Sequence, residues 1–378
     1  MSSAINRRDL LKLGSLTALG LGLSAPSWGL GNEDGLIRTP VAPDGLINLS
    51  SNENPYGISP KAREALLNAL NEAHRYQYNH AHLKNFKKEI AEHYGVNENQ
   101  VLVSAGSGEA LGLLPRHFSN GKLVTANPTF GILPATAKML GQEVIEVPLT
   151  PDQKHDLPAM LKAVDNNTSL VYVCNPANPS STIVSSASLK NFCIEASKKA
   201  YVGVDEAYID FLDAPDNESM MQLIEKHPKV FVIGTFSKIH AMAGLRIGWV
   251  IGHPTLIKSL ADNYFTRTQM SLSALSMSAA LASLKDPAWL KQCKDKNAAA
   301  RDYAYNALKA LNIDVVRSYT NFLFFPIPNY QGDFAADMLT KNIYLRSSNY
   351  IHGKWARASV GTMDEMKQFI EVMKTVKV

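Results

Sequence analysis

The sequence predicts an α/β fold, with a large domain built on a mostly parallel sheet and a smaller α+β domain after it. Strand-like apolar runs alternate with amphipathic helical runs between residues 59 and 285. This alternation is typical of a parallel sheet covered on both faces. After residue 285 the pattern changes to one long helix and several short strands. At 378 residues, 46% of them hydrophobic, the chain can bury a core in both domains.

The large domain is expected to begin with two helices and to continue as alternating strands and helices. Ser59 and Pro60 are a typical cap and first-turn pair for the helix in "SPKAREALLNALNEAHRY", and Gly95 ends the helix in "HLKNFKKEIAEHYG". The strand-like runs are "QVLVSAG", "KLVTANP", "EVIEVPL", "SLVYVCNP", "AYVGVDEAY", "KVFVIGTFSK" and "RIGWVIG", with helices expected from Glu109, over Ile132 to Leu140 and over Ala187 to Lys199.

The small domain is expected to start with a long helix from Pro287 to Leu311. "IDVVRS" and "NFLFFPI" are predicted to be antiparallel strands, and "DFAADMLTKN" a helix. Two further short strand-like runs, "IYLR" and "WARASVG", precede a closing helix from Asp364.

Composition argues against nucleic-acid binding and against a metal site. The formal net charge is +4, and the first 30 residues carry half of it, so the remainder shows too small an excess of positive charge for nucleic acid. The cysteines are Cys174, Cys193 and Cys293, and they form no CxxC pair or Cys/His cluster with metal-ligand spacing. The sequence is compatible with a disulfide between two of them and with three free cysteines.

Residues 1–30 have the layout of an export signal. Arg7 and Arg8 open "RRDLLK", which resembles the twin-arginine motif with Leu10 where Phe is commoner. An uncharged, glycine-rich stretch of 18 residues follows, from 13 to 30. A membrane anchor is the alternative, although the stretch is short for a span. We expect a periplasmic protein without stable membrane association after export; the other possibility is a cytoplasmic protein with an unprocessed tail.

Polar residues follow the carboxyl ends of the strand-like runs, where ligands bind in open α/β sheets. They are Ser107, Gly108 and Glu109 at a helix start, Asn175 and Asn178 in "CNPANP", Asp205, Glu206 and Tyr208 in "VDEAY", and Thr235, Ser237 and Lys238 in "TFSK". This set suits pyridoxal phosphate. The aldehyde of this cofactor needs a lysine, its ring nitrogen needs an acid, and its phosphate needs hydroxyl groups and an arginine. Lys238 would bind the aldehyde, and Arg246 would return to the phosphate.

The chain also resembles a known family. "NLSSNENPYG", "NPTFG", "NPANP", "VDEAYIDF", "TFSKIHAMAGLRIGW" and "ARASVGT" occur in the order found in class I and II aminotransferases of the aspartate-aminotransferase fold, fold type I of the pyridoxal-phosphate enzymes. They are most similar to the histidinol-phosphate aminotransferase branch. The resemblance covers nearly everything after residue 45. With it we expect an N-terminal arm at 31–58 that joins the small domain, a large domain at 59–285 and a small domain at 286–378.

The resemblance implies a role for each matching residue. Lys238 would link to the cofactor and shuttle the proton, and Asp205 would pair with the ring nitrogen. At the ring, Asn178 and Tyr208 would hold the ring oxygen and Phe130 would stack on the ring. The phosphate would be held by Ser107, Gly108, Ser237 and Arg246, with Glu109 and Thr235 as further expected cofactor contacts. At the substrate, Arg357 would bind the carboxylate with help from Arg346, and Tyr56 would line the pocket. It also implies a homodimer in which Tyr76 reaches the partner subunit's cofactor, with Tyr78 as a close competitor.

The expected reaction is amino transfer between an amino acid and a 2-oxo acid. Departures from the family pattern, "NPANPSST" and "YQYNH", put the substrate in doubt more than the cofactor. Because an exported enzyme would not meet a cytoplasmic intermediate, we expect a donor other than histidinol phosphate, such as an aromatic or other bulky amino acid. A true histidinol-phosphate aminotransferase, a decarboxylase or lyase on the same scaffold, and a non-catalytic cofactor-binding protein are the alternatives.

Overall fold

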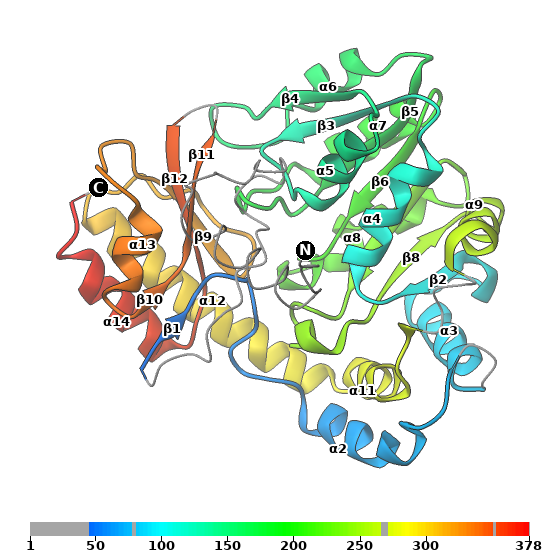
Figure 1. Ribbon diagram of the computed structural model, residues 1–378, viewed down its shortest axis with the longest axis horizontal. Helices are drawn as coiled ribbons and strands as arrows, with labels where there is room; N and C mark the ends of the chain where they lie inside the picture. The colour runs from blue at the N-terminus through cyan, green and yellow to red at the C-terminus, as the bar shows by residue number, and fades with distance from the viewer. Residues whose placement is uncertain (1–44, 78–80, 266–270, 351–352, 378) are drawn as a thin grey trace, which may run out of the picture.

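The computed structural model describes residues 45–77, 81–265, 271–350 and 353–377 (Figure 1). The predicted export signal and the first half of the predicted arm, residues 31–44, lie outside these residues. In Figure 1 a large body with a seven-stranded sheet lies beside a smaller body that contains β9, β11 and β12, and the long helix α12 runs beneath both. None of the described helices is long and apolar enough to span a membrane.

The large sheet has the strand order β2-β8-β7-β6-β5-β3-β4. All neighbouring pairs are parallel except those that involve β8, which runs antiparallel to both β2 and β7. The mostly parallel sheet is therefore confirmed. Its strands are β2 (Val101–Ser104), β3 (Lys122–Asn127), β4 (Val144–Pro148), β5 (Thr168–Cys174), β6 (Tyr201–Asp205), β7 (Val230–Thr235) and β8 (Gly248–Gly252).

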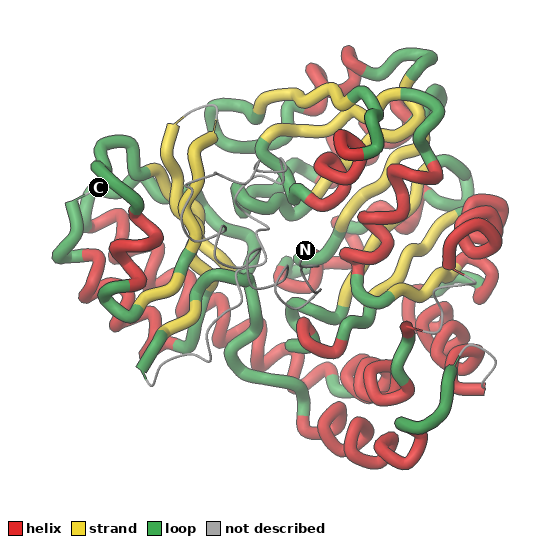
Figure 2. Tube along the Cα trace, viewed as in Figure 1, coloured by secondary structure: helices red, strands yellow, loops and turns green. Residues whose placement is uncertain are grey.

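Helices cover both faces of this sheet, as Figure 2 shows. Alternate side chains along each strand enter opposite cores, so Val171 and Val173 pack in one core while Leu170 and Tyr172 pack in the other. The first core is closed by α2 (Pro60–Asn68), α3 (Ala81–Tyr94), α6 (Leu157–Ala163), α7 (Ser186–Ala196) and α11 (Ala274–Leu284), and the second by α4 (Ser107–His117), α5 (Ile132–Met139) and α9 (Pro254–Leu260).

The smaller body has its own core. Helices α12 (Pro287–Ala310), α13 (Phe334–Leu339) and α14 (Met363–Met373) pack on a sheet of order β11-β12-β9, formed by β11 (Arg346–Tyr350), β12 (Gly353–Ser359) and β9 (Phe322–Pro326). The N-terminal strand β1 (Ile47–Asn48) pairs in parallel with β10 (Ile343–Tyr344), and Ile47 and Leu49 are buried in the same core.

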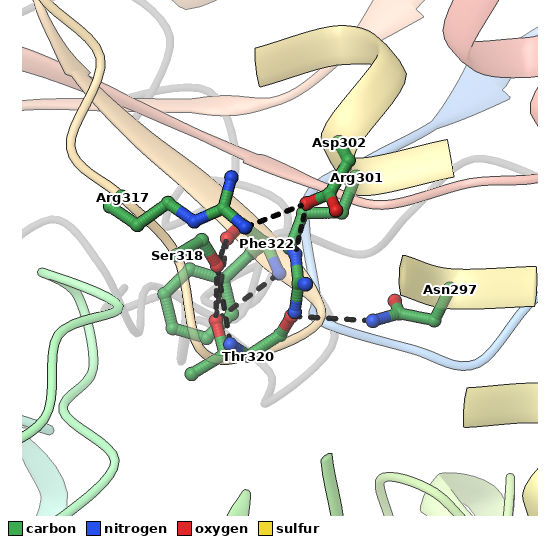
Figure 3. A network of polar contacts seen from close by, with 7 residues as sticks. All are labelled: Asn297, Arg301, Asp302, Arg317, Ser318, Thr320 and Phe322. Atoms are coloured by element: carbon green, nitrogen blue, oxygen red, sulfur yellow. Dashed lines mark hydrogen bonds and ion pairs between the residues drawn. The ribbon is translucent and has the colours of Figure 1, made fainter. Parts of the chain in front are cut away.

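The strand predicted over "IDVVRS" is wrong. Residues 313–318 form no strand. Val316 N donates to Phe324 O at 2.9 Å, but the chain then enters a turn, and this single backbone hydrogen bond does not extend into a strand pairing. The turn is tight: Ser318 Oγ donates to Phe322 O at 2.6 Å, and Asn297 of α12 donates to Thr320 O at 3.3 Å (Figure 3). Arg317 and Arg301 both contact the carboxylate of Asp302 beside it.

Candidate active site

A cavity of about 250 Å³ lies where the carboxyl ends of the large sheet face the smaller body. It is lined by most of the residues that the sequence predicted: Ser107, Gly108, Phe130, Asn178, Asp205, Tyr208, Thr235, Ser237, Lys238, Arg246, Arg346 and Arg357. Both bodies contribute, because Arg346 and Arg357 belong to β11 and β12. Parallel strands bring residues distant in sequence to one edge of the sheet, which is why the motifs converge.

One end of the cavity is built to hold an anion. Helix α4 begins at Ser107, and its cap residue Gly106 has no side chain, which leaves the positive end of the helix open. Arg246 lies against this turn, with Nη2 donating to Ala105 O at 3.4 Å. Gly106 has φ +78°, and a Cβ there would collide with the Arg246 guanidinium. Glycine therefore serves two purposes here, the left-handed turn and the close approach of the arginine.

The Asp205 carboxyl lies at the floor of the cavity, almost fully buried. Tyr172 Oη donates to Asp205 Oδ2 at 2.9 Å, and the Ala207 backbone N–H donates to Oδ1 at 3.1 Å. Burial raises the pKa of Asp205 to about 6, against these hydrogen bonds. Tyr172 was missed by sequence reasoning because it lies in an apolar strand and looked like a core residue; a buried phenol needs a partner for its hydroxyl, and that was the available signal.

Lys238 occupies the middle of the cavity. Desolvation, helped by the positive charge of Arg357, lowers the pKa of its amine to about 8. Lys238 Nζ donates to the Asn52 carbonyl at 3.3 Å and lies 5.5 Å from the centre of the Tyr208 ring. A lysine with this pKa loses its proton far more readily than one in water, as a general base requires.

The far side of the cavity is a row of polar contacts from Arg357. Its Nη1 donates to Asn178 Oδ1 at 2.7 Å and its Nη2 to Ser50 O at 3.0 Å, while Nε is buried without a partner among the described residues. Asn178 Nδ2 in turn donates to Tyr208 Oη at 3.3 Å. Arg346 Nε also donates to Ser50 O, at 3.0 Å. The two guanidinium groups can therefore present positive charge to one anionic ligand.

Some predicted residues do not line the cavity. The Glu109 carboxylate turns back to accept from Ala105 N at 2.6 Å at the start of its own helix. Tyr56 packs in a small apolar cluster with Tyr208, and Tyr76 is 71% exposed. Tyr78 lies outside the described residues.

Two buried acid–base groups close to the motifs are structural. Glu206, next to Asp205, accepts from Met220 N and from Ser219 Oγ, both at 2.7 Å, on the side away from the cavity. His240, two residues after Lys238, contacts Ser283 Oγ at 2.8 Å and packs on Phe236. Neither side chain lines the cavity. Among the described residues, no group of His, Cys, Asp or Glu is placed to hold a metal ion, and the three cysteines are free and buried.

Comparison with known proteins decides the class. Residues 44–373 match the family model described as aminotransferase class I and II. The chain belongs to this family. It is 36% identical to histidinol-phosphate aminotransferase 1 of Bacillus cereus over 333 residues, 87% of this chain and 88% of the relative. It is 30% identical to histidinol-phosphate aminotransferase of Bacillus subtilis over 340 residues, 89% of this chain and 93% of the relative.

The solved structures agree on the fold. Histidinol-phosphate aminotransferase from Sinorhizobium meliloti, in complex with pyridoxal-5'-phosphate, superposes with a TM-score of 0.78 at 23% identity, over 88% of this chain and 92% of that chain. Aspartate aminotransferase from Thermus thermophilus with maleate gives 0.76 at 19% identity, over 88% and 92%. The chain is thus a pyridoxal-phosphate-dependent aminotransferase with the aspartate-aminotransferase fold.

The residues of the cavity fit this cofactor. The Gly106 turn that only a glycine can make, with Arg246 and the α4 N-terminus, suits a phosphate. The buried Asp205 carboxyl suits a positively charged ring nitrogen, and the partly desolvated Lys238 amine suits an aldehyde. Each of these positions therefore matches a group that the cofactor carries: its phosphate, its ring nitrogen or its aldehyde.

Proposed function

We propose that this aminotransferase moves an amino group between an amino acid and a 2-oxo acid, with Lys238 as the proton carrier. The observation that carries the proposal is that one cavity holds a buried lysine, a buried acid, an open helix N-terminus with Arg246, and Arg357. Each of these answers a different requirement of the reaction.

The cofactor is held at three points. Ser107, Gly108, Thr235, Ser237 and Arg246 would bind its phosphate, Asp205 would pair with its ring nitrogen, Asn178 and Tyr208 would bind its ring oxygen, and Phe130 would pack on the ring. Pyridoxal phosphate, when bound, supplies an aldehyde that combines with amines and a ring that accepts the electron pair of a broken C–H bond.

Asp205 keeps the ring nitrogen charged. Charges about 4 Å apart at an effective dielectric of about 20 attract by roughly 4 kcal/mol, which corresponds to about three pKa units at 1.36 kcal/mol per unit. The same attraction lowers the pKa of Asp205 from about 6, so the carboxylate is ionised at neutral pH when its partner is present.

Lys238 moves the protons of the reaction. Its Nζ accepts the proton from the α-carbon of the donor, and in the reverse half-reaction it gives a proton to the α-carbon of the acceptor. A pKa of about 8 lets the amine do both near neutral pH. Arg357, helped by Arg346, binds the carboxylate of the substrate through its planar fork of donors.

The active enzyme is a homodimer in this proposal. Tyr76 is exposed in the single chain although it is large and aromatic, which is expected of a residue that reaches into the partner subunit's site. Tyr56 does not line the cavity of the single chain, but its packing against the cluster of Tyr208 supports a place for it beside the substrate.

The donor and the location are linked. The twin-arginine segment supports export to the periplasm, and with it a bulky or aromatic amino-acid donor. The relatives of 30–36% identity favour a second candidate, histidinol phosphate in the cytoplasm. Arg357 would be used in either case, because the 2-oxo acid acceptor carries a carboxylate, so Arg357 alone does not discriminate them.

One paired experiment separates the candidates. The host cell is fractionated with wild-type protein and with an Arg7→Lys, Arg8→Lys variant, and the purified enzyme is screened with amino acids and with histidinol phosphate. Export that stops in the variant, with turnover of an amino acid and little of histidinol phosphate, supports the first candidate. Protein found only in the cytoplasm that turns over histidinol phosphate efficiently supports the second.

A further inference from the structure

Asn52 occupies an unusual position in the wall of the cavity. It lies in the segment between β1 and α2, is 2% exposed and has a left-handed backbone with φ +52°. Asparagine tolerates this conformation better than most residues. Its backbone carbonyl accepts from Lys238 Nζ at 3.3 Å and from Asn321 Nδ2 at 3.0 Å, and its side chain points to the Tyr208 hydroxyl.

The orientation of the neighbouring carboxamide, Asn178, follows from Arg357. A guanidinium can only donate hydrogen bonds, so the atom that faces Arg357 Nη1 at 2.7 Å has to be the carbonyl oxygen, Oδ1. The amide nitrogen of Asn178 therefore faces Tyr208 Oη, at 3.3 Å, and donates to it.

The orientation of Asn52 follows from Ser359 in the same way. The backbone N–H of Asn52 donates to Ser359 Oγ at 2.7 Å, which leaves the hydroxyl proton of Ser359 available for another acceptor. That acceptor is Asn52 Oδ1, at 3.3 Å. The amide nitrogen of Asn52 is thereby directed to Tyr208 Oη, at 2.9 Å.

Tyr208 Oη thus accepts from two amide nitrogens at once. A phenol oxygen has two acceptor positions and one proton, so both acceptor positions are filled. Within the described part of the chain these are the hydrogen bonds that Tyr208 makes. Its proton is left to point in the remaining direction, into the cavity that Tyr208 lines.

We propose that Asn52 is a positioning residue, which together with Ser359 holds Tyr208 as a hydrogen-bond donor toward the ring oxygen of the cofactor. This inference rests on the proposed function, because it takes Tyr208 to face that oxygen. Tyr208 belongs to the large body, but in this proposal its orientation also depends on Asn52 of the N-terminal segment and on Ser359 at the end of β12. Asn321 follows Thr320 in the turn shown in Figure 3, and its Nδ2 donates to the backbone carbonyls of Asn52 and Glu53, which restrains this part of the N-terminal segment.

Two substitutions separate the side chain of Asn52 from its backbone. Asn52→Asp keeps the shape but replaces the donating amide with a carboxylate oxygen, which accepts the proton of Tyr208 and draws it away from the cavity. Asn52→Gly removes the carboxamide and tolerates φ +52°, so it carries the test even where the aspartate variant folds poorly.

The test compares two ligands on cofactor-free protein. Dissociation constants are measured for pyridoxal phosphate and for 3-deoxypyridoxal phosphate, which lacks the ring oxygen. Loss of one hydrogen bond to a charged oxygen predicts about tenfold or more weaker binding of pyridoxal phosphate in both variants. Binding of the deoxy analogue should change by less than about twofold. Ser359→Ala, which frees the Asn52 carboxamide to turn, should weaken pyridoxal phosphate binding by an intermediate factor.

Two results would overturn the inference. Equal losses for the two ligands would mean that Asn52 acts on the fold of the site in general, and unchanged binding of pyridoxal phosphate in both variants would mean that it does not act on Tyr208. A wild-type protein that binds no pyridoxal phosphate would instead reject the proposed function itself.

Discussion

At the scale of single residues, the site depends on burying a lysine and a carboxylic acid in the same cavity. Burial disfavours the charged form of each group, so the pKa of Lys238 falls to about 8 while that of Asp205 rises to about 6. The pKa of Lys238 is close to neutral pH, so this amine can change its protonation state during turnover, whereas the charged ring nitrogen proposed above would keep Asp205 ionised. Sequence motifs identified both residues, but the pKa of Lys238 depends on burial and on Arg357, and that of Asp205 on burial and on Tyr172, which no local pattern contains.

The shifted pKa of Lys238 should reduce the stability of the cofactor-free protein. Its pKa is lower in the folded state, about 8, than the ordinary 10.5 of an unfolded chain. The destabilisation is therefore absent above about pH 10.5, grows as the pH falls from 10.5 to 8, and stays constant below about 8. Lys238→Met should raise the free energy of unfolding by roughly 3 kcal/mol at pH 7 and by roughly 2 kcal/mol at pH 9.

The measurement is denaturant unfolding of cofactor-free protein between pH 7 and 10, the range in which the contribution of Lys238 changes. Lys226→Met, which removes an exposed lysine, is the matched control and should show no such pH dependence. If the two variants behaved alike, Lys238 would not be desolvated as described.

At the scale of elements, the turn between β2 and α4 forms the proposed phosphate site. Gly106→Ala should lower cofactor affinity about tenfold or more, because the new methyl group displaces the Arg246 guanidinium. It should also destabilise the protein by roughly 1–3 kcal/mol, because alanine rarely adopts φ +78° with ψ 160°.

Gly95→Ala is a control for the backbone effect. Gly95 also has a positive φ, +66°, but a Cβ there meets nothing within 4 Å. It should likewise lose stability and bind the cofactor normally, as equilibrium dialysis with pyridoxal phosphate can test. Equal affinities in the two variants would remove Gly106 from the phosphate site.

Element prediction succeeded where local chemistry decides and failed where long-range contacts decide. The Ser59 cap accepts from Ala62 N at 3.1 Å, and α3 ends at Tyr94, before Gly95, as predicted. The long helix α12 is confirmed within one residue at its end. By contrast, the valines of "IDVVRS" favour a strand by propensity, yet the turn at Ser318 leaves them without a strand partner.

At the scale of the whole molecule, the site exists because three parts of the chain meet. The large sheet supplies Lys238 and Asp205, the small sheet supplies Arg357, and the N-terminal segment supplies Asn52. Lys238 and Asp205 follow or end strands of the large sheet and have clear chemical roles, whereas Arg357 lies within β12 and was identified through the family resemblance of its motif. In the sequence, Asn52 looks like an ordinary turn residue and Tyr172 like an ordinary core residue. Their contacts in the site become visible only in the folded structure.

The proposed dimer can be tested by complementation. If Tyr76 reaches the partner subunit's site, mixed dimers of Lys238→Ala and Tyr76→Phe chains contain one site with both native residues. Such dimers should recover activity well above that of either variant alone, with the subunit composition verified by two affinity tags. Absence of recovery in verified mixed dimers would count against Tyr76, and Tyr78 would be tested next.

The most direct test of the account is to trap the cofactor on the protein. Purified enzyme loaded with pyridoxal phosphate is reduced with borohydride, digested and analysed by mass spectrometry, in parallel with Lys238→Ala. We predict a yellow wild-type protein whose only modified peptide carries the cofactor on Lys238, and a variant that retains the fold but has neither the modification nor transamination. Cofactor trapped on another lysine, or a Lys238→Ala variant that still transaminates at the wild-type rate, would contradict the central claim.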